Sequence, residues 1–321
     1  MASKSGIAIA GSIIVDKINE ISSYPASGEL TKILSLTKAV GGCVSNTSID
    51  IKKIDASIPV KSLGKIGNDH DGDFLVETLL KNGVDVSLLT RGDNPTSFTD
   101  VMSVVGGQRT FFAFPGACDD FGYDDIDFEK LDVRMLHLGY FLLLNKVDNG
   151  DGLKILQKSK EMGIKTSIDL VSENSDRYHV VKECLQYTDN VIINEFEAGM
   201  IAGIEPKIEN LEIIARKIKS MGVSERVIIH MPEVSICLSN KGLFKLSSYK
   251  LPEGFIKGTT GAGDAFCAGA LIGIYRNLDE SNILALASKS AVASLSSQDS
   301  ISGMKSEEEI DKMLEKMNIS I

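Results

Sequence analysis

Residues 258–266, Gly-Thr-Thr-Gly-Ala-Gly-Asp-Ala-Phe, carry the strongest structural signal in this chain of 321 residues. Small and apolar residues follow from Ala265 to Tyr275, which predicts a closely packed helix behind a glycine-rich turn. The start of a buried helix leaves backbone N–H groups without intrahelical partners and carries the positive end of the helix dipole. The run therefore predicts an anion site that suits a phosphate group.

Asp264 stands at this predicted anion site, where a bound phosphate repels a carboxylate. A carboxylate is useful there if it accepts a proton from an attacking hydroxyl group. The amides of Gly261, Ala262 and Gly263 would stabilise the charge on the transferred group. The combination indicates phosphoryl transfer to a hydroxyl, although a plain glycine turn capped by an aspartate gives a similar short pattern.

Other stretches identify the same chemistry more specifically. They are Asp16, Gly41-Gly42-Cys43-Val44-Ser45-Asn46, Gly64-Lys65-Ile66-Gly67-Asn68-Asp69-His70-Asp71-Gly72 and Asn194-Glu195-Phe196-Glu197. With these stretches and residues 258–266, the chain resembles the ribokinase/PfkB family of carbohydrate kinases, because the motifs occur in that family's order and span nearly the whole chain. The resemblance implies a ribokinase-like three-layer α/β/α fold with a mostly parallel central sheet and a small β-sheet lid.

The resemblance also implies an activity and a set of site residues. The expected reaction is ATP- and Mg²⁺-dependent transfer of the γ-phosphate to a hydroxymethyl group of a small sugar or sugar derivative, with Asp264 as base and the amides of residues 261–264 as anion hole. Glu197 is expected to hold Mg²⁺ through water, since that ion keeps much of its hydration shell. The expected acceptor-binding residues are Asp16, Gly41, Gly42 and Asn46, and the expected nucleotide-binding residues are Asn194, Glu197, Thr260, Gly261 and Gly263.

Departures from the family pattern limit the choice of substrate. Cys43 replaces the Lys usual in ribokinases, and no sugar-binding Glu is evident around Tyr140, so ribose is not indicated. Gly258 replaces the Asp that commonly opens the 258–266 run, which weakens the case for a monovalent-cation site. His230 opens a segment that replaces a familiar Gly-x-x-Gly, and it is either a nucleotide contact or a hydrogen-bonded structural histidine.

Two further side chains stay outside the expected set. Asp169 ends a predicted strand and matches an acidic family position, but the residues that follow it do not, which leaves it a supporting role. Arg109 lies beside a Gly-Gly turn, where it either reaches a polar acceptor or remains a solvated surface charge.

Two other functions remain open at this point. One is a nucleoside (adenosine-like) kinase, because aromatic residues at 111, 112 and 114 suit a base. The other is a catalytically idle sugar or nucleotide sensor, which does not require Asp264. A P-loop kinase and a dinucleotide-dependent oxidoreductase are excluded by the absence of their glycine motifs.

Composition sets the broader class. With 34 basic and 44 acidic residues the net charge is −10, which argues against nucleic acid or an anionic membrane as partner. No apolar stretch reaches transmembrane length. Five scattered cysteines without a Cys-x-x-Cys pair indicate reduced thiols and a cytoplasmic protein.

Alternating β-rich and helical patterns predict one ribokinase-like domain over residues 1–321. Lid segments are expected at about 17–40 and 96–114, the second as two strands around a Gly106-Gly107 turn, and the lid could join two chains in a homodimer. The expected strands are Ile7–Ile14, Leu30–Leu36, Lys61–Gly64, Ser97–Val105, Gln108–Phe114, Met135–Leu138, Lys165–Asp169, Val191–Ile193 and Val227–Ile229. The expected helices are Val44–Ile54, Asp71–Asn82, Gly150–Met162, Asn210–Met221, Ala265–Tyr275, Asn282–Ser296 and Ser306–Met317.

Overall fold

The computed structural model describes residues 4–104, 109–173 and 175–320. The predicted Gly106-Gly107 turn lies outside these residues. Their main feature is a nine-stranded sheet in the order β13-β12-β11-β10-β9-β8-β1-β4-β5, parallel except at the β11–β12 and β12–β13 pairs. Its strands are β1 (Ile7–Gly11), β4 (Val60–Gly67), β5 (Asp85–Gly92), β8 (Met135–Phe141), β9 (Lys165–Leu170), β10 (Asn190–Asn194), β11 (Arg226–His230), β12 (Val234–Ser239) and β13 (Gly242–Ser247).

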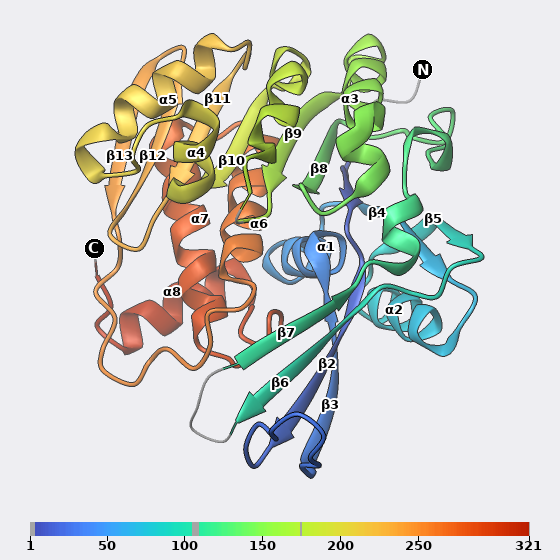
Figure 1. Ribbon diagram of the computed structural model, residues 1–321. Helices are drawn as coiled ribbons and strands as arrows, with labels where there is room; N and C mark the ends of the chain where they lie inside the picture. The colour runs from blue at the N-terminus through green and yellow to red at the C-terminus, as the bar shows by residue number, and fades with distance from the viewer. Residues whose placement is uncertain (1–3, 105–108, 174, 321) are drawn as a thin grey trace.

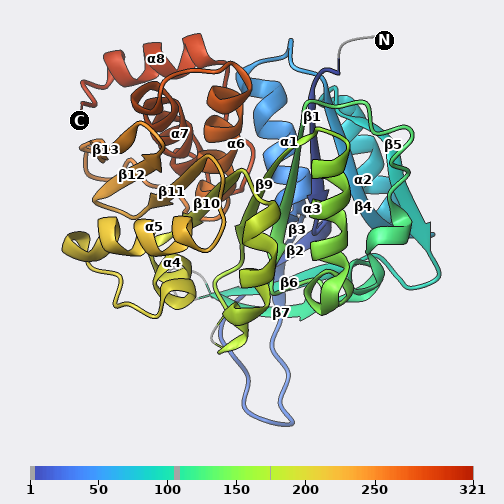
Figure 2. The ribbon, with the colours of Figure 1, turned by 90° about the horizontal axis from the view of Figure 1, so that it is seen from above.

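Helices cover both faces of this sheet, which confirms the predicted three layers (Figure 2). The central strands are buried on both faces, as expected for parallel strands between helices. On one face lie α1 (Gly42–Ile54), α6 (Ala262–Tyr275) and α7 (Glu280–Leu295), with α2 (His70–Lys81) beside α1 and α8 (Glu307–Lys316) outside α7. On the other face lie α3 (Gly152–Glu161), α4 (Glu195–Ala202) and α5 (Leu211–Ser220).

A second, four-stranded sheet projects from the edge of the body (Figure 1). We call it the small sheet, and it confirms the predicted addition to the α/β body. Its strands run in the order β3-β2-β6-β7 and are β2 (Ile14–Ile21), β3 (Ile33–Gly41), β6 (Phe98–Val104) and β7 (Arg109–Phe114).

Several predicted boundaries were wrong. The apolar run 7–14 is not one strand, because the chain turns at Gly11 (φ +134°) and Ile14 already begins a strand of the other sheet. The helix predicted from Ala265 begins at Ala262, which places Asp264 in its first turn. Strands β5, β12 and β13 and helix α4 were not predicted, because short apolar runs without a clear period carry little local signal.

The strand order fixes where a ligand can bind. β1 pairs with β4 on one side and with β8 on the other. The chain adds strands on one side of β1 up to β5 and then adds β8 and its successors on the other side, so the strand order reverses beside β1. Ligands of open α/β sheets bind beyond the carboxyl ends of the strands at such a point. In the described part of the chain, no helix has both the length and the apolar character needed to cross a membrane.

Candidate active site

The predicted site residues gather around the start of α6 at the carboxyl ends of the strands. Asp264 lines two adjoining cavities, one of about 590 Å³ and one of about 160 Å³. We call them the large cavity and the small cavity. Thr260 and Gly261 line both, and so does Phe111 of the small sheet. The chain thus brings the glycine-rich turn, the sheet ends and the small sheet to one place.

Asp264 is buried and held by two donors from distant segments. Its Oδ2 accepts hydrogen bonds from Asn46 Nδ2 (2.8 Å) and from the Tyr140 hydroxyl (3.1 Å). Loss of solvent outweighs these bonds and raises the pKa of Asp264 from 3.8 to about 7. A carboxylate with a pKa near neutrality is suited to accept a proton at physiological pH.

The turn before α6 requires glycine at position 261. Gly261 has φ +82°, and a Cβ there would lie 2.5 Å from the Cβ of Ser300. The first amides of α6 therefore approach the cavities without a side chain in front of them. The Ala262 amide donates to Thr259 O at 3.3 Å, so it is already partly engaged. Gly263 lines the large cavity, whereas Ala262 lines a third cavity described below.

Tyr140 is a site residue that the sequence did not indicate. It lies at the end of β8 with φ +61°, a left-handed conformation that costs energy for a residue with a large side chain. Its amide donates to Asp169 Oδ1 (2.6 Å) and its hydroxyl donates to Asp264 Oδ2. Burial, followed by the charge of Asp264, raises the pKa of Tyr140 well above its usual value, so the phenol keeps its proton and remains a donor. The role of Tyr140 is visible only in its backbone conformation and its tertiary contacts, and no sequence motif indicates it.

Asn46 contacts the predicted base as well as the small cavity. Its Nδ2 donates to Asp264, and its Oδ1 accepts from Ser300 Oγ at 2.9 Å. The amide is buried at 4% exposure and belongs to the first turns of α1. Its position thus orients Asp264, and it also lines the space beside Asp16.

Asp16 lies on β2 and lines the small cavity. Gly42, at the start of α1, lines the same cavity. Burial raises its pKa from 3.8 to about 6, and its carboxylate accepts no hydrogen bond from the described residues. Gly41 makes room for it, because a Cβ on Gly41 would lie 2.6 Å from Asp16 Oδ2. A desolvated carboxylate without a protein partner is suited to accept hydrogen bonds from ligand hydroxyls.

Asn194 and Glu197 form a capping box at the start of α4. The Asn194 side chain caps the helix, because its Oδ1 accepts from the backbone N–H of Glu197 (2.9 Å). In return, Glu197 Oε2 accepts from the backbone N–H of Asn194 (3.1 Å). Glu197 Oε1 also accepts from Ser172 Oγ (2.8 Å). Burial raises the pKa of Glu197 from 4.5 to about 8.

The capping box also faces the large cavity, which Asn194, Glu197 and Asp169 all line. Two buried carboxyl groups beside one cavity can serve a cation as oxygen partners, and both oxygens of Glu197 are already hydrogen-bonded. These residues therefore fit a hydrated Mg²⁺ that Glu197 contacts through water. They fit direct ligation by Glu197 less well.

A third cavity of about 430 Å³ opens on the other side of the α6 start. We call it the apolar cavity, because Met231, Tyr249, Leu251 and Ile256 are among the residues that line it. His230 lines both the large and the apolar cavity and packs against Phe266, with ring centroids 4.5 Å apart and ring planes tilted by 35°. Burial lowers the pKa of His230 to about 4, so the ring is neutral. The sequence offered no motif for this cavity, whose lining comes from segments spread over residues 194–295.

The remaining candidates are also placed. Asp169 contacts Tyr140 and His137 below the large cavity, and Arg109 is an exposed residue that lines the small cavity. Gly258 is closely packed, because a Cβ there would lie 2.9 Å from the carbonyl oxygens of Ser297 and Gln298. An acidic side chain at that position would require this segment to move.

Comparison with known proteins agrees with the geometry. A ribokinase of Arabidopsis thaliana is 22% identical over 289 residues, which cover 89% of this chain and 74% of that protein. An adenosine kinase of Saccharomyces cerevisiae is 25% identical over 281 residues, which cover 83% of this chain and 81% of that protein. The structure of the A. thaliana ribokinase in complex with ribose and ATP superposes with a TM-score of 0.84 at 20% identity, over 97% of this chain and 98% of that one. Residues 5–307 match the pfkB family carbohydrate kinase, and the chain therefore belongs to the pfkB family of carbohydrate kinases.

Proposed function

We propose that this kinase transfers the γ-phosphate of ATP to a hydroxymethyl group of a small sugar or sugar derivative. The observation that carries the proposal is the environment of Asp264. Both hydrogen bonds to its carboxyl group are made at Oδ2, so Oδ1 accepts none from the described residues, beside the two cavities that the residue lines. Asp264 would accept the proton of the attacking hydroxyl, while amides of residues 261–264 stabilise the transferred phosphoryl group.

The three cavities suggest where each part of the substrates binds. The apolar cavity suits the nucleobase, because its lining is mostly apolar and His230 and Phe266 offer ring faces. The start of α6 suits the phosphates. The small cavity suits the acceptor, because Asp16, Asn46 and Asp264 all line it.

The size of the small cavity favours a sugar over a nucleoside. Its volume is about 160 Å³, against about 590 Å³ for the adjoining large cavity. A single sugar ring fits such a space better than a sugar that carries a purine. The resemblance to an adenosine kinase keeps a nucleoside as the second candidate acceptor. A catalytically idle sensor is less well supported, because it would not need a buried carboxylate with a pKa near neutrality.

We infer that Mg²⁺ accompanies the nucleotide in the large cavity. Glu197 and Asp169 would hold its water ligands, and the bound ion would neutralise charge on the phosphates. A cation there would favour the ionised form of Glu197 and offset the rise in its pKa that burial causes.

The small sheet would act as a lid on one kinase domain and as a dimer contact. Phe111 already lines both the large and the small cavity from this sheet. The sheet also exposes large apolar side chains, including Leu34 (55%), Leu36 (66%) and Phe112 (57%). Exposed apolar clusters of this kind indicate a protein contact, and a second copy of the chain is the occupant that we propose.

A reducing compartment, the cytoplasm, is the location that we propose. All five cysteines are free thiols and buried, and none is paired with another in the described part of the chain. Proteins of oxidising compartments more often use cysteines in disulfides.

An acceptor screen tests the proposed reaction. The protein is incubated with ATP, Mg²⁺ and one member of a panel of pentoses, hexoses, keto-sugar acids or nucleosides, and release of ADP is followed. We expect acceptor-dependent release with a monosaccharide or its acid, and its loss in Asp264→Asn. Release with nucleosides alone would select the second candidate. Silence over the panel from a protein that binds ATP would favour a sensor.

Sedimentation tests the proposed dimer. The wild-type chain is expected to sediment as a dimer, and the double variant Leu34→Lys, Leu36→Glu as a monomer with an unchanged circular dichroism spectrum. A matched change of two exposed apolar residues outside the small sheet, Leu80→Lys and Ile213→Lys, should leave the dimer intact. A monomeric wild-type chain would contradict the proposal.

A further inference from the structure

Three metal-binding side chains converge beneath the large cavity. His137 lies on β8, Asp169 on β9 and Cys267 on α6, and all three are buried. One donor atom from each lies within 4.8 Å of those of the other two. His137 Nε2 is 3.2 Å from Asp169 Oδ2 and 3.5 Å from Cys267 Sγ. We propose that these residues form a binding site for a thiophilic divalent metal ion such as Zn²⁺.

The protonation of the three groups supports a metal between them. A single ring nitrogen, His137 Nε2, faces both the carboxylate and the sulfur. If that nitrogen carries a proton, it can donate to Asp169 and cannot accept from the thiol. If it carries none, it can accept from the thiol and leaves Asp169 Oδ2 without its donor. A metal ion removes this conflict, because nitrogen, sulfur and oxygen then bind it at the same time.

Neighbouring groups already orient two of the ligands. His137 Nδ1 lies 3.0 Å from Ser167 Oγ, a contact that fixes the ring and directs Nε2 at the metal. Asp169 Oδ1 accepts from the Tyr140 amide at 2.6 Å, which leaves Oδ2 for the metal. Metal-binding histidines and carboxylates usually have such partners on their other atoms. The cluster therefore has the surroundings of a site as well as the ligands.

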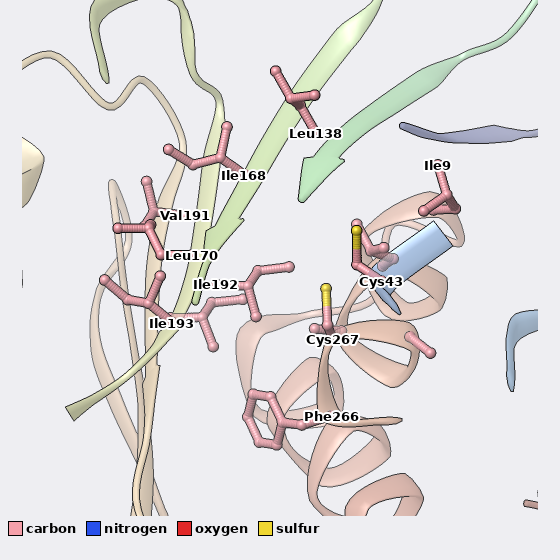
Figure 3. Packing of buried hydrophobic residues seen from close by; sticks show 14 of the residues in the cluster. Ile9, Cys43, Leu138, Ile168, Leu170, Val191, Ile192, Ile193, Phe266 and Cys267 are labelled. Atoms are coloured by element: carbon pink, nitrogen blue, oxygen red, sulfur yellow. The ribbon is translucent and has the colours of Figure 1, made fainter. Parts of the chain in front are cut away.

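An entry path and a free coordination position are present as well. Asp169 and Cys267 line the large cavity, so an ion can arrive from it and keep a water ligand on that side. Figure 3 shows the Cys267 side chain projecting from α6 toward the strands. Three protein ligands with one open position are typical of accessible zinc sites.

The ligand set selects the type of metal. Cys and His with one carboxylate suit Zn²⁺, whereas Mg²⁺ takes oxygen ligands and keeps its waters. Binding forms a sulfur–metal bond and releases the thiol proton to solvent. This site shares Asp169 with the one that we propose for Mg²⁺, and it differs from that site in using His137 and Cys267 in place of Glu197.

Cobalt binding tests the proposal independently of activity. Chelator-treated protein is titrated with Co²⁺, which reports a sulfur ligand by a thiolate-to-metal absorption band, and then with Zn²⁺ to displace it. We expect one ion per chain at micromolar concentrations. Cys267→Ala should abolish the band and weaken Zn²⁺ binding more than about 100-fold, because even the outer partners of metal ligands contribute 10–100-fold.

Controls keep the test decisive. Cys237→Ala removes another buried cysteine, on β12, and should leave the band and the affinity unchanged. Binding that survives Cys267→Ala, or that is lost equally in Cys237→Ala, would overturn the proposal. If Cys267→Ala does not fold, X-ray absorption of the zinc-loaded wild-type protein decides the matter. One sulfur ligand with nitrogen and oxygen neighbours supports the site, and a shell without sulfur overturns it.

Discussion

Replacement of Asp264 by Asn should make the protein more stable and nearly inactive at the same pH. In Asp264→Asn the side-chain oxygen can take the place of Oδ2 and accept from Asn46 and Tyr140, while the new NH₂ group faces the cavities. The packing and both hydrogen bonds are kept, and only the ionisable group is lost. The proton acceptor is lost with it, which should lower turnover by about 10²–10⁴-fold.

The size of the stability gain follows from the pKa of Asp264. Its value in the folded chain, about 7, is higher than the 3.8 of the unfolded chain, so the native state binds more protons between these two pH values. Stability conferred by the wild-type residue therefore falls as pH rises from about 4 to about 7. Above that range the wild-type chain has lost about 4 kcal/mol of unfolding free energy, since each unit of pKa shift corresponds to 1.36 kcal/mol. The Asp264→Asn variant has no ionisable group at this position and does not lose this stability.

Thermal unfolding at two pH values measures this effect. At pH 8 the melting temperature of Asp264→Asn should exceed that of the wild type by roughly 5–10 °C, and near pH 4.5 the two should nearly coincide. Asp93→Asn, which removes an exposed carboxylate, should show no such dependence on pH. Asp264→Ala should gain less, because it leaves the donors of Asn46 and Tyr140 without an acceptor. Equal melting temperatures of Asp264→Asn and wild type at pH 8 would refute the desolvation of Asp264, and normal turnover would refute its role as base.

Three further changes probe the rest of the site. Tyr140→Phe removes a hydrogen bond that lowers the pKa of Asp264, so the acidic limb of kcat/KM against pH should move up by about half to one pH unit, and an unmoved limb would exclude this contact from tuning the base. Asp16→Asn should raise the KM of the acceptor by roughly 10–100-fold, the worth of a charged hydrogen bond, while the KM of ATP stays the same. An equal rise in both constants would remove Asp16 from the acceptor site. Glu197→Gln should raise the Mg²⁺ concentration needed for half-maximal rate by roughly tenfold, about 1.4 kcal/mol, in a magnesium titration. An unchanged titration would show that its charge does not reach the metal.

Local sequence was sufficient wherever the physical cause is local. A glycine turn before small residues predicts a helix start with free amides, because those residues act within one or two turns of each other. Alternation of apolar strands with helices similarly predicts a parallel sheet between two helical layers. The order of the motifs then led to the family, which the match over residues 5–307 confirms.

Strand boundaries show where local reasoning fails. Residues 7–14 are apolar except for Gly11 and Ser12, yet the chain leaves one sheet and enters the other within them. An apolar residue in the sequence indicates that its side chain is buried, but it does not indicate which of the two sheets its strand joins. The division therefore depends on the turn at Gly11 and on the partners of each strand, which are β4 and β8 for β1 but β3 and β6 for β2.

The sequence by itself determined the fold class, and it pointed to the start of α6 as the candidate anion site and to Asp264 as the candidate base. The tertiary structure alone decided the chemical state of that residue and its partners. Asn46 and Tyr140 reach Asp264 across 218 and 124 residues of chain, and no motif joins the three. The pKa of a carboxylate depends on how much water the surrounding atoms remove and on which donors replace it, and those atoms come together only when the chain has folded.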